Sequence, residues 1–286
     1  MKKKFTSFLA VAAFAALVAS GEGLAPSPAR AAEEKPPLFS LSGGIDFPTA
    51  YFFRGIQQQD EGVIYQPYAN LYWNAYKGKD FSITPWAGVW NSIHEEKGAG
   101  NKKHYEIDYL AGVDFGVGPL TIGAGYTLYH YPSDVFEDIH EVQLKFTFDD
   151  GDLIKMTRFP FKLSPYVMFA WETKDKGGTE DAYWEIGLRP SFEGKIGAVP
   201  FTFGVPVTVG FSGDDYYFKK NGKEANLGFV SVAATASIPL PMPKEAGSWS
   251  LGLKVEYLYL DAFSARASNN GRTDEVIGMV GLAVAF

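Results

Sequence analysis

The chain has 286 residues, a formal net charge of −7 and no cysteine, and 46% of its residues are hydrophobic and 16% aromatic. The acidic balance argues against nucleic-acid binding, which depends on basic patches that face phosphate. The absence of cysteine excludes disulfides and thiolate metal sites. Beyond the N-terminal segment, no apolar run approaches the length of about 18 residues that a membrane-spanning helix needs.

The first residues have the three-part order of a secretory signal peptide. A basic cluster at residues 2–4 precedes an apolar run at 8–19, and small residues follow. The apolar run is too short to span a membrane as a helix. We therefore expect a signal peptide over residues 1–31, cleaved after Ala31 or after Ser20, that exports the rest of the chain. A flexible apolar N-terminus that is retained is the alternative.

An alternation of apolar and polar residues dominates the rest of the chain. Between Tyr105 and Val117 the odd positions are all apolar, whereas the even positions are mostly acidic residues or glycine. Period two is the side-chain period of a β-strand, and a strand with one wholly apolar face separates two different solvents. Segments of this kind number about twelve. They lie near residues 38–55, 63–77, 81–94, 104–117, 120–132, 139–149, 161–173, 181–194, 199–212, 227–240, 249–262 and 274–286.

These segments predict an all-β fold, namely a transmembrane antiparallel up-and-down β-barrel of about 12 strands over residues 32–286. Most segments reach the ten or so residues that a tilted strand needs to cross the hydrocarbon. Short turns alternate with longer polar loops, as in outer-membrane barrels. The connection at 151–160 is an exception, being long and partly apolar, and we expect an extended hairpin or a surface-lying segment there.

A soluble, secreted β-sandwich is the alternative fold, because it also shows alternation and turn signals. The polar faces here hold many Gly, Ser, Thr and Tyr residues, and the apolar faces are continuous and edged with aromatic residues. That distribution favours a barrel with lipid outside it. We therefore expect the exported chain in the outer membrane of a Gram-negative bacterium, with membrane lipid as a partner.

Aromatic residues lie near the ends of the apolar faces, where a barrel meets the two membrane–water interfaces. The expected interface residues are Tyr65, Trp73, Trp171, Trp184, Trp249 and Tyr257. The chain ends on Phe286 behind alternating apolar residues. A terminal Phe on the lipid face resembles the C-terminal recognition signal of bacterial outer-membrane barrels, so the barrel-assembly machinery is an expected partner.

Two stretches of the first half carry a family resemblance. Residues 42–59 read SGGIDFPTAYFFRGIQQQ, and residues 106–132 read EIDYLAGVDFGVGPLTIGAGYTLYHYP. A first strand that ends in a Phe-Arg-Gly turn, and a Glu-x-Asp-Tyr strand followed by a hairpin ending in Tyr-Pro, resemble the TorF-type porin family. The resemblance is clearest over about residues 40–150. It implies an outer-membrane barrel assigned as a porin, and it supplies no substrate.

Charged residues of the polar parity should face the barrel interior, because a charge on the lipid face near mid-membrane costs a few kcal/mol. Acidic residues dominate this set, and carboxylates in a pore concentrate cations. We therefore expect a porin-like channel for passive diffusion of small polar, preferably cationic, solutes. The expected pore-lining residues are Asp46, Arg54, Glu106, Asp108, Asp114, Glu141, Lys145, Glu172, Glu185, Arg189, Glu193, Lys254 and Glu256.

The alternative function is a plugged barrel that does not conduct and acts as a structural or surface-binding protein through its external loops. Neighbouring charges such as Lys254 and Glu256 could pair and fill the interior together with aromatic side chains. Eight strands leave room only for side chains and sixteen leave an aqueous channel, so about twelve allow either outcome. Arg54, beside Gly55, is expected to be a pore-mouth charge or, by preference, a donor that stabilises a turn.

A barrel hydrolase is the least favoured function. His94, Glu95 and His104 flank one loop, but the glycines and lysines between them give no fixed metal-ligand geometry. Ser133 lies near His130 without any nucleophile motif around it. We therefore expect no catalytic residue, no metal and no cofactor.

Overall fold

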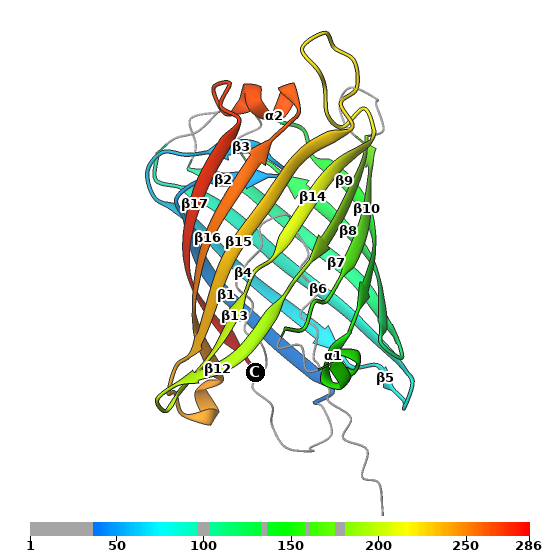
Figure 1. Cartoon of the computed structure of the whole chain (residues 1–286), viewed down its shortest axis with the longest axis vertical. Helices are drawn as coiled ribbons and strands as arrows, with labels where there is room; N and C mark the ends of the chain where they lie inside the picture. The colour runs from blue at the N-terminus through cyan, green and yellow to red at the C-terminus, as the bar shows by residue number, and fades with distance from the viewer. Residues whose placement is uncertain (1–36, 97–102, 133–135, 158–160, 175–180) are drawn as a thin grey trace, which may run out of the picture.

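The computed structural model describes residues 37–96, 103–132, 136–157, 161–174 and 181–286. Residues 1–31, which carry the expected signal peptide, lie outside the described residues. Strands make up most of the described chain, and two short α-helices lie at opposite ends of the molecule (Figure 1).

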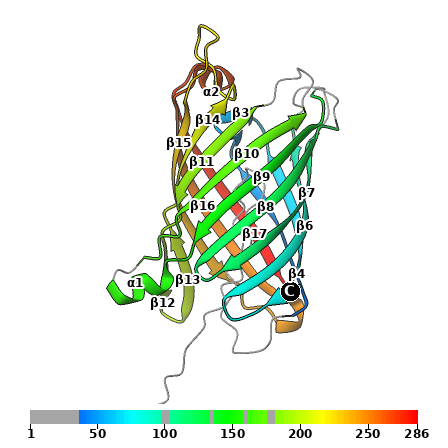
Figure 2. The same cartoon turned by 90° about the vertical axis from the view of Figure 1, so that its right-hand side faces the viewer.

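Within the described residues, twelve antiparallel strands form the closed wall of a barrel (Figures 1 and 2). Each wall strand pairs with the wall strands before and after it in the chain, and β1 closes the ring on β17, where Asp46 lies opposite Gly281. The expected 12-stranded up-and-down barrel is confirmed. The wall strands are β1 (Phe39–Pro48), β4 (Ile64–Trp73), β6 (Phe81–His94), β7 (His104–Val117), β8 (Leu120–His130), β9 (Ile139–Phe148), β10 (Tyr166–Lys174), β11 (Ala182–Leu188), β14 (Val207–Asp214), β15 (Leu227–Pro239), β16 (Ser248–Leu260) and β17 (Asp274–Ala285).

Two of the expected strand segments divide into shorter strands near proline residues, Pro190 and Pro206. Proline has no N–H for the ladder and a fixed φ, so it interrupts regular pairing. The pieces that result, β12 (Ser191–Ile196) and β13 (Val199–Gly204), form a hairpin with each other. This hairpin joins the wall because β13 pairs with β15.

The two ends of the barrel differ. One end, named the terminal end below, carries Phe286 and tight turns such as Gly118-Pro119 (Figure 1). Short elements at these turns are β5 (Tyr76–Lys77) and the 3-10 helix η2 (Lys244–Ala246). The opposite end, named the loop end, carries longer connections and α2 (Phe263–Ser268).

The long connection after β9 contains a short helix, α1 (Gly151–Thr157), which projects from the wall near the terminal end (Figure 2). Asp150 fixes the returning chain, because its carboxylate accepts hydrogen bonds from the N–H groups of Leu163 and Ser164. The described part of this connection, residues 151–157, is therefore a short helix with Leu153 51% exposed, and not part of an extended hairpin. No helix of the described residues is long and apolar enough to cross a membrane.

The expected first strand, residues 38–55, is too long. β1 ends at Pro48, and the chain then turns into the interior as a hairpin of β2 (Tyr51–Phe53) and β3 (Ile56–Gln59). All three residues of β2 are at least partly buried. A wall strand would expose alternate residues to lipid, so three consecutive aromatic residues are accommodated better inside the barrel than in its wall.

Candidate functional site

The inward face of the wall carries the charged side chains that the alternation assigned to it. In β7, Tyr109 is 49% exposed on the outside whereas its neighbour Asp108 is 1% exposed. In β9, Val142 is 39% exposed and Glu141 is 0% exposed. A side chain that is inaccessible in a single-layered wall must point into the barrel, because the outer surface is uncovered.

The predicted pore-lining residues fall into three groups by burial. Buried residues are Asp46, Arg54, Glu106, Asp108, Glu141, Glu172 and Lys254. Partly buried residues are Asp114, Lys145, Glu185, Arg189 and Glu256, whereas Glu193 is exposed in β12. Arg54 differs from the others because it lies on the inward hairpin and not on the wall.

The tip of the inward hairpin is a two-residue turn at Arg54 and Gly55. Both residues have positive φ, 47° and 76°, as a type I′ hairpin turn requires. The tip also touches the wall, since a Cβ added to Gly55 would lie 3.0 Å from the Cβ of Phe229 in β15. Glycine therefore suits this position for its conformation and for its size.

Aromatic residues of the hairpin pack against one side of the wall. The ring centroids of Tyr51 and Trp90 are 5.4 Å apart, and those of Phe53 and Tyr129 are also 5.4 Å apart. Tyr51 and these wall residues belong to one buried cluster that spans β4, β6, β7 and β8.

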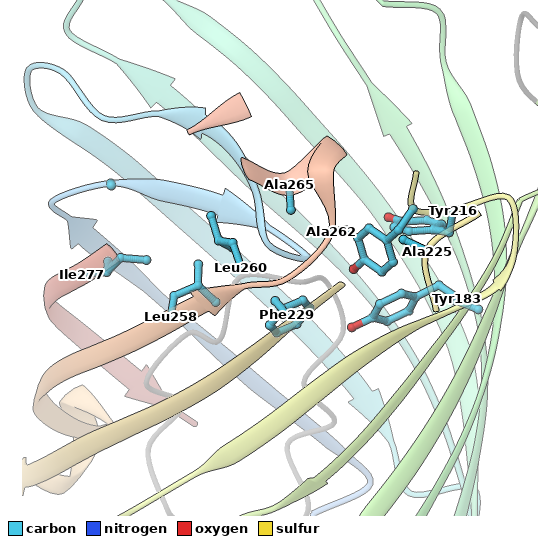
Figure 3. Close-up of a cluster of buried hydrophobic side chains, with 12 residues drawn as sticks. Tyr183, Tyr216, Ala225, Phe229, Leu258, Leu260, Ala262, Ala265 and Ile277 are labelled. Carbon is cyan, nitrogen blue, oxygen red and sulfur yellow. The ribbon is translucent and has the colours of Figure 1, made fainter. Parts of the chain in front are cut away.

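A second buried cluster lies on the other side of the lumen, and Phe52 of the hairpin packs against it. Figure 3 shows Tyr183, Phe229 and Leu258 of this cluster pointing inward from different wall strands. Since the hairpin touches both clusters, it fills the loop-end half of the lumen between opposite walls.

Polar contacts anchor the hairpin along its whole length. The Tyr51 hydroxyl donates to Glu106 Oε2 at 2.8 Å, and the Tyr105 hydroxyl donates to Gln58 Oε1 at 2.5 Å. In β3, the N–H of Gln57 donates to Ser268 Oγ of α2 at 2.9 Å. The hairpin is therefore attached to the wall and to the connection that covers the loop end.

Arg54 anchors the tip of the hairpin through a buried ion pair. Its Nη1 and Nη2 atoms donate to the two carboxylate oxygens of Glu141 at 2.6 and 2.8 Å. The side chains of this pair are 2% and 0% exposed. The guanidinium carbon lies 4.2 Å from the ring centroid of Tyr183 and 5.5 Å from that of Tyr216. A bidentate ion pair next to aromatic faces is a strong arrangement for a buried arginine.

The connection between β14 and β15 covers the hairpin tip. The Tyr217 hydroxyl donates to the carbonyl oxygen of Arg54 at 2.8 Å, and the Tyr216 hydroxyl accepts from Arg54 Nη1 at 3.2 Å. Tyr217 is fully buried. Tyr216 and Tyr217 of this connection therefore contribute to the interior, whereas its Lys219 and Lys220 are exposed.

The terminal-end half of the lumen is lined differently. Lys145 and Arg189 each place their cationic group 4.6 Å from the ring centroid of Tyr166. The Tyr166 hydroxyl donates to Glu185 at 2.6 Å, and Lys254 pairs with Glu256 at 2.9 Å. These charged groups form a mixed lining with more basic character than the acidic loop-end wall.

The expected interface aromatics lie near strand ends. Trp73, Trp171, Trp184 and Tyr257 are 41–49% exposed on the outer surface. Tyr65 and Trp249 are half-buried: Tyr65 packs against Phe47, and Trp249 Nε1 donates to the carbonyl oxygen of Ala246. Phe286 is 58% exposed, and its N–H donates to the carbonyl oxygen of Leu41, so it completes the pairing of β17 with β1.

The histidines at the β6–β7 connection do not converge on one point. His94 is buried, with Nε2 2.9 Å from Ser92 Oγ and its ring stacked on Tyr105. His104 instead places Nε2 3.1 Å from Asn91 Oδ1. In the part of the chain that the structure describes, no group of three or more histidine and carboxylate side chains could hold a metal ion. Ser133 lies outside the described residues.

Sequence reasoning missed the tyrosines that surround Arg54. Tyr129 and Tyr183 lie on the polar parity of their strands, and Tyr216 lies in a polar loop, but no sequence pattern relates them to Arg54. One local signal was present: the Arg54-Gly55 pair interrupts an aromatic run, as a hairpin turn does. Its partner Glu141 is 87 positions away, and nothing in the sequence connects the two.

Comparison with known proteins gives the fold alone. No family model matches the sequence, and no curated protein matches it significantly. Among solved structures, an outer membrane channel from Pseudomonas putida F1 is similar over 90% of this chain and 100% of its own, at 10% identity and a TM-score of 0.50. This similarity agrees with the closed barrel seen here.

Two further solved structures are less similar. CdiB from Acinetobacter baumannii aligns over 87% of this chain at 10% identity and a TM-score of 0.47, and the chain spans 60% of the length of CdiB. The NanC porin aligns over 86% of this chain and 98% of its own, at 13% identity and a TM-score of 0.42.

Proposed function

We propose that the protein is an outer-membrane channel for passive diffusion of small polar solutes, and that the hairpin β2–β3 closes its loop-end half in the structure described. The terminal end then faces the periplasm, as the short-turn end of outer-membrane barrels does. Solutes pass when the hairpin leaves its place between the two aromatic clusters. The protein needs no cofactor for this activity and catalyses no reaction.

One observation carries the proposal: a polar, charged inner wall lies within a closed barrel whose outer surface is apolar. Buried charges such as Asp46 and Lys254 point inward along the membrane-spanning part of the wall. If the only role of these side chains were to fill the lumen, apolar side chains would give a more stable protein, because burying a charge carries a desolvation penalty. A lining that keeps these charges supports passage of hydrated solutes.

The test is single-channel recording of the refolded chain in a planar bilayer under a salt gradient. We expect rare openings with long closures, and a reversal potential that favours cations, since acidic residues dominate the loop-end wall. Steady wide-open conductance would contradict closure by the hairpin. A permanently silent, correctly folded barrel would contradict the channel.

The second candidate is a permanently plugged barrel that acts through its loop-end surface. The buried ion pair between Arg54 and Glu141 favours it, because breaking such a pair costs about 3–5 kcal/mol. The two candidates differ in one measurable respect. The wild type opens rarely if the protein is a closed channel, and it stays silent if the plug is permanent, even where variants that loosen the hairpin conduct.

A further inference from the structure

The wall groups that contact Arg54, namely the Glu141 carboxylate and the Tyr183 ring, are held in place by hydrogen bonds to other wall residues. Oε1 of Glu141 accepts a hydrogen bond from the Tyr129 hydroxyl at 3.0 Å and another from Gln143 Nε2 at 2.5 Å. The Tyr183 hydroxyl donates to Glu185 at 2.7 Å, which fixes the ring that lies over the guanidinium. None of these contacts involves the hairpin. The carboxylate and the ring therefore have supporting contacts that remain when Arg54 is removed.

The geometry of this wall site matches a planar cation. Two carboxylate oxygens meet two parallel N–H groups of a guanidinium at 2.6 and 2.8 Å, and the Tyr183 ring centroid lies 4.2 Å from the guanidinium carbon. A bidentate fork suits guanidinium and not ammonium, and an aromatic face adds attraction for a delocalised cation. The carboxylate of Glu172 lies on the strand position opposite Glu141, which adds negative charge to the same stretch of wall.

The hairpin supplies one cation to this site. Arg54 is the only charged residue between Tyr51 and Gln59, and it adopts a φ of 47°, which non-glycine residues rarely adopt. The guanidinium is thus delivered into a wall site by a strained turn at the tip of a two-stranded hairpin.

We infer that the wall site formed by Glu141 and Tyr183, together with Tyr216 of the β14–β15 connection, is a binding site for a small guanidinium-bearing solute, and that Arg54 occupies it as a tethered substitute. A solute guanidinium that takes the place of Arg54 removes the deepest anchor of the hairpin and favours its release. This release rests on the proposed channel function, whereas binding to the wall site does not.

Methylguanidinium is the probe that tests the site, because it carries the same planar cation as Arg54. The variant Arg54→Ala, refolded in detergent, should bind methylguanidinium saturably by isothermal titration calorimetry, with a rise in melting temperature. The double variant Arg54→Ala/Glu141→Gln should not bind methylguanidinium. Urea, which is planar but neutral, should not bind to Arg54→Ala. Methylammonium should bind at least about tenfold more weakly, since it lacks the fork.

Absence of saturable binding to a folded Arg54→Ala barrel would overturn the inference, and so would equal binding to the double variant. If Arg54→Ala does not fold, the titration is made on Arg54→Lys, in which the bidentate pair is lost. Methylguanidinium should then bind about tenfold more tightly than to the wild type, and equal affinity overturns the inference.

Bilayer recording of the same proteins separates this inference from the proposed function. If Arg54→Ala binds methylguanidinium and never conducts, the cation site stands and the channel fails. If Arg54→Ala conducts and binds no methylguanidinium, the channel stands and the cation site fails. In the wild type, millimolar methylguanidinium should raise the open probability more than methylammonium does, and equal effects would contradict displacement of Arg54.

Discussion

The two halves of the lumen share one wall and differ in what fills them. At the loop end, inward carboxylates such as Glu106 and Glu141 are at most 2% exposed, because the hairpin covers them. Toward the terminal end, Lys145 and Glu185 lie on the same inward parity and remain partly exposed. Strand number and alternation are the same in both halves. In the proposed channel, we therefore attribute closure to the hairpin of residues 51–59 and the connection packed on its tip, and not to the barrel wall.

The largest effect on the loop-end half is expected from removing the carboxylate of its ion pair. Glu141→Gln leaves the buried Arg54 guanidinium without its partner charge, which should lower the free energy of unfolding by about 3–5 kcal/mol. The open probability of the channel should rise at the same time. Urea unfolding in lipid vesicles and bilayer recording measure the two effects.

Glu193→Gln is the matched control for that substitution. Glu193 is exposed in β12, so the same chemical change should alter the free energy of unfolding by less than about 0.5 kcal/mol. Equal stability losses for the two variants would mean that the ion pair does not hold the hairpin.

A smaller effect is expected at the hairpin tip. Gly55→Ala puts a Cβ 3.0 Å from Phe229 and forces a non-glycine residue to a φ of 76°. The left-handed conformation alone costs about 1–2 kcal/mol. Gly118→Ala is the control, because Gly118 also has positive φ, 56°, but a Cβ there meets nothing within 4 Å.

Both glycine variants should have a lower free energy of unfolding, because alanine is strained at positive φ. Of the two, only Gly55→Ala should also increase the open probability of the channel. Thermal unfolding and single-channel recording of the two variants distinguish strain from loss of hairpin packing. Opening in Gly118→Ala as well would show that channel closure responds to general destabilisation and not to the hairpin.

The smallest effects are expected from charge substitutions in the two halves of the lumen. These substitutions should shift the reversal potential in opposite directions. In an Arg54→Ala background, Glu106→Gln with Asp108→Asn should move the reversal potential toward zero, because the loop-end wall loses two carboxylates. Lys145→Gln should instead increase cation preference, since it removes a cation from the terminal-end half. Reversal potentials under a salt gradient measure both, and a shift of the same sign would contradict the lumen assignment.

The alternation predicted the wall well because lipid and lumen act as two different solvents on each strand. In the segment from Tyr105 to Val117, for example, Tyr109 and Val117 of the apolar parity are exposed on the outside of β7. Tyr105 is the exception, because it is buried beside the hairpin and donates a hydrogen bond to Gln58. The interior hairpin was not predicted, because Tyr51, Phe52 and Phe53 continue β1 as a plausible β-rich run. Arg54 was expected at a pore mouth or in a turn. Its pairing with Glu141 was not predicted, because the closed barrel brings the two residues together and no local sequence pattern encodes that proximity.

The central claim, that the lumen is closed only while the hairpin is in place, is tested most directly by replacing residues 51–59 with a glycine-serine linker. β1 and β4 are neighbours whose loop-end residues Asp46 and Gln66 lie opposite each other, so a short linker can join them. Single-channel recording of the replaced chain beside the wild type should show large, steady conductance where the wild type is mostly closed. A replaced chain that folds as a barrel and stays as silent as the wild type would contradict the account.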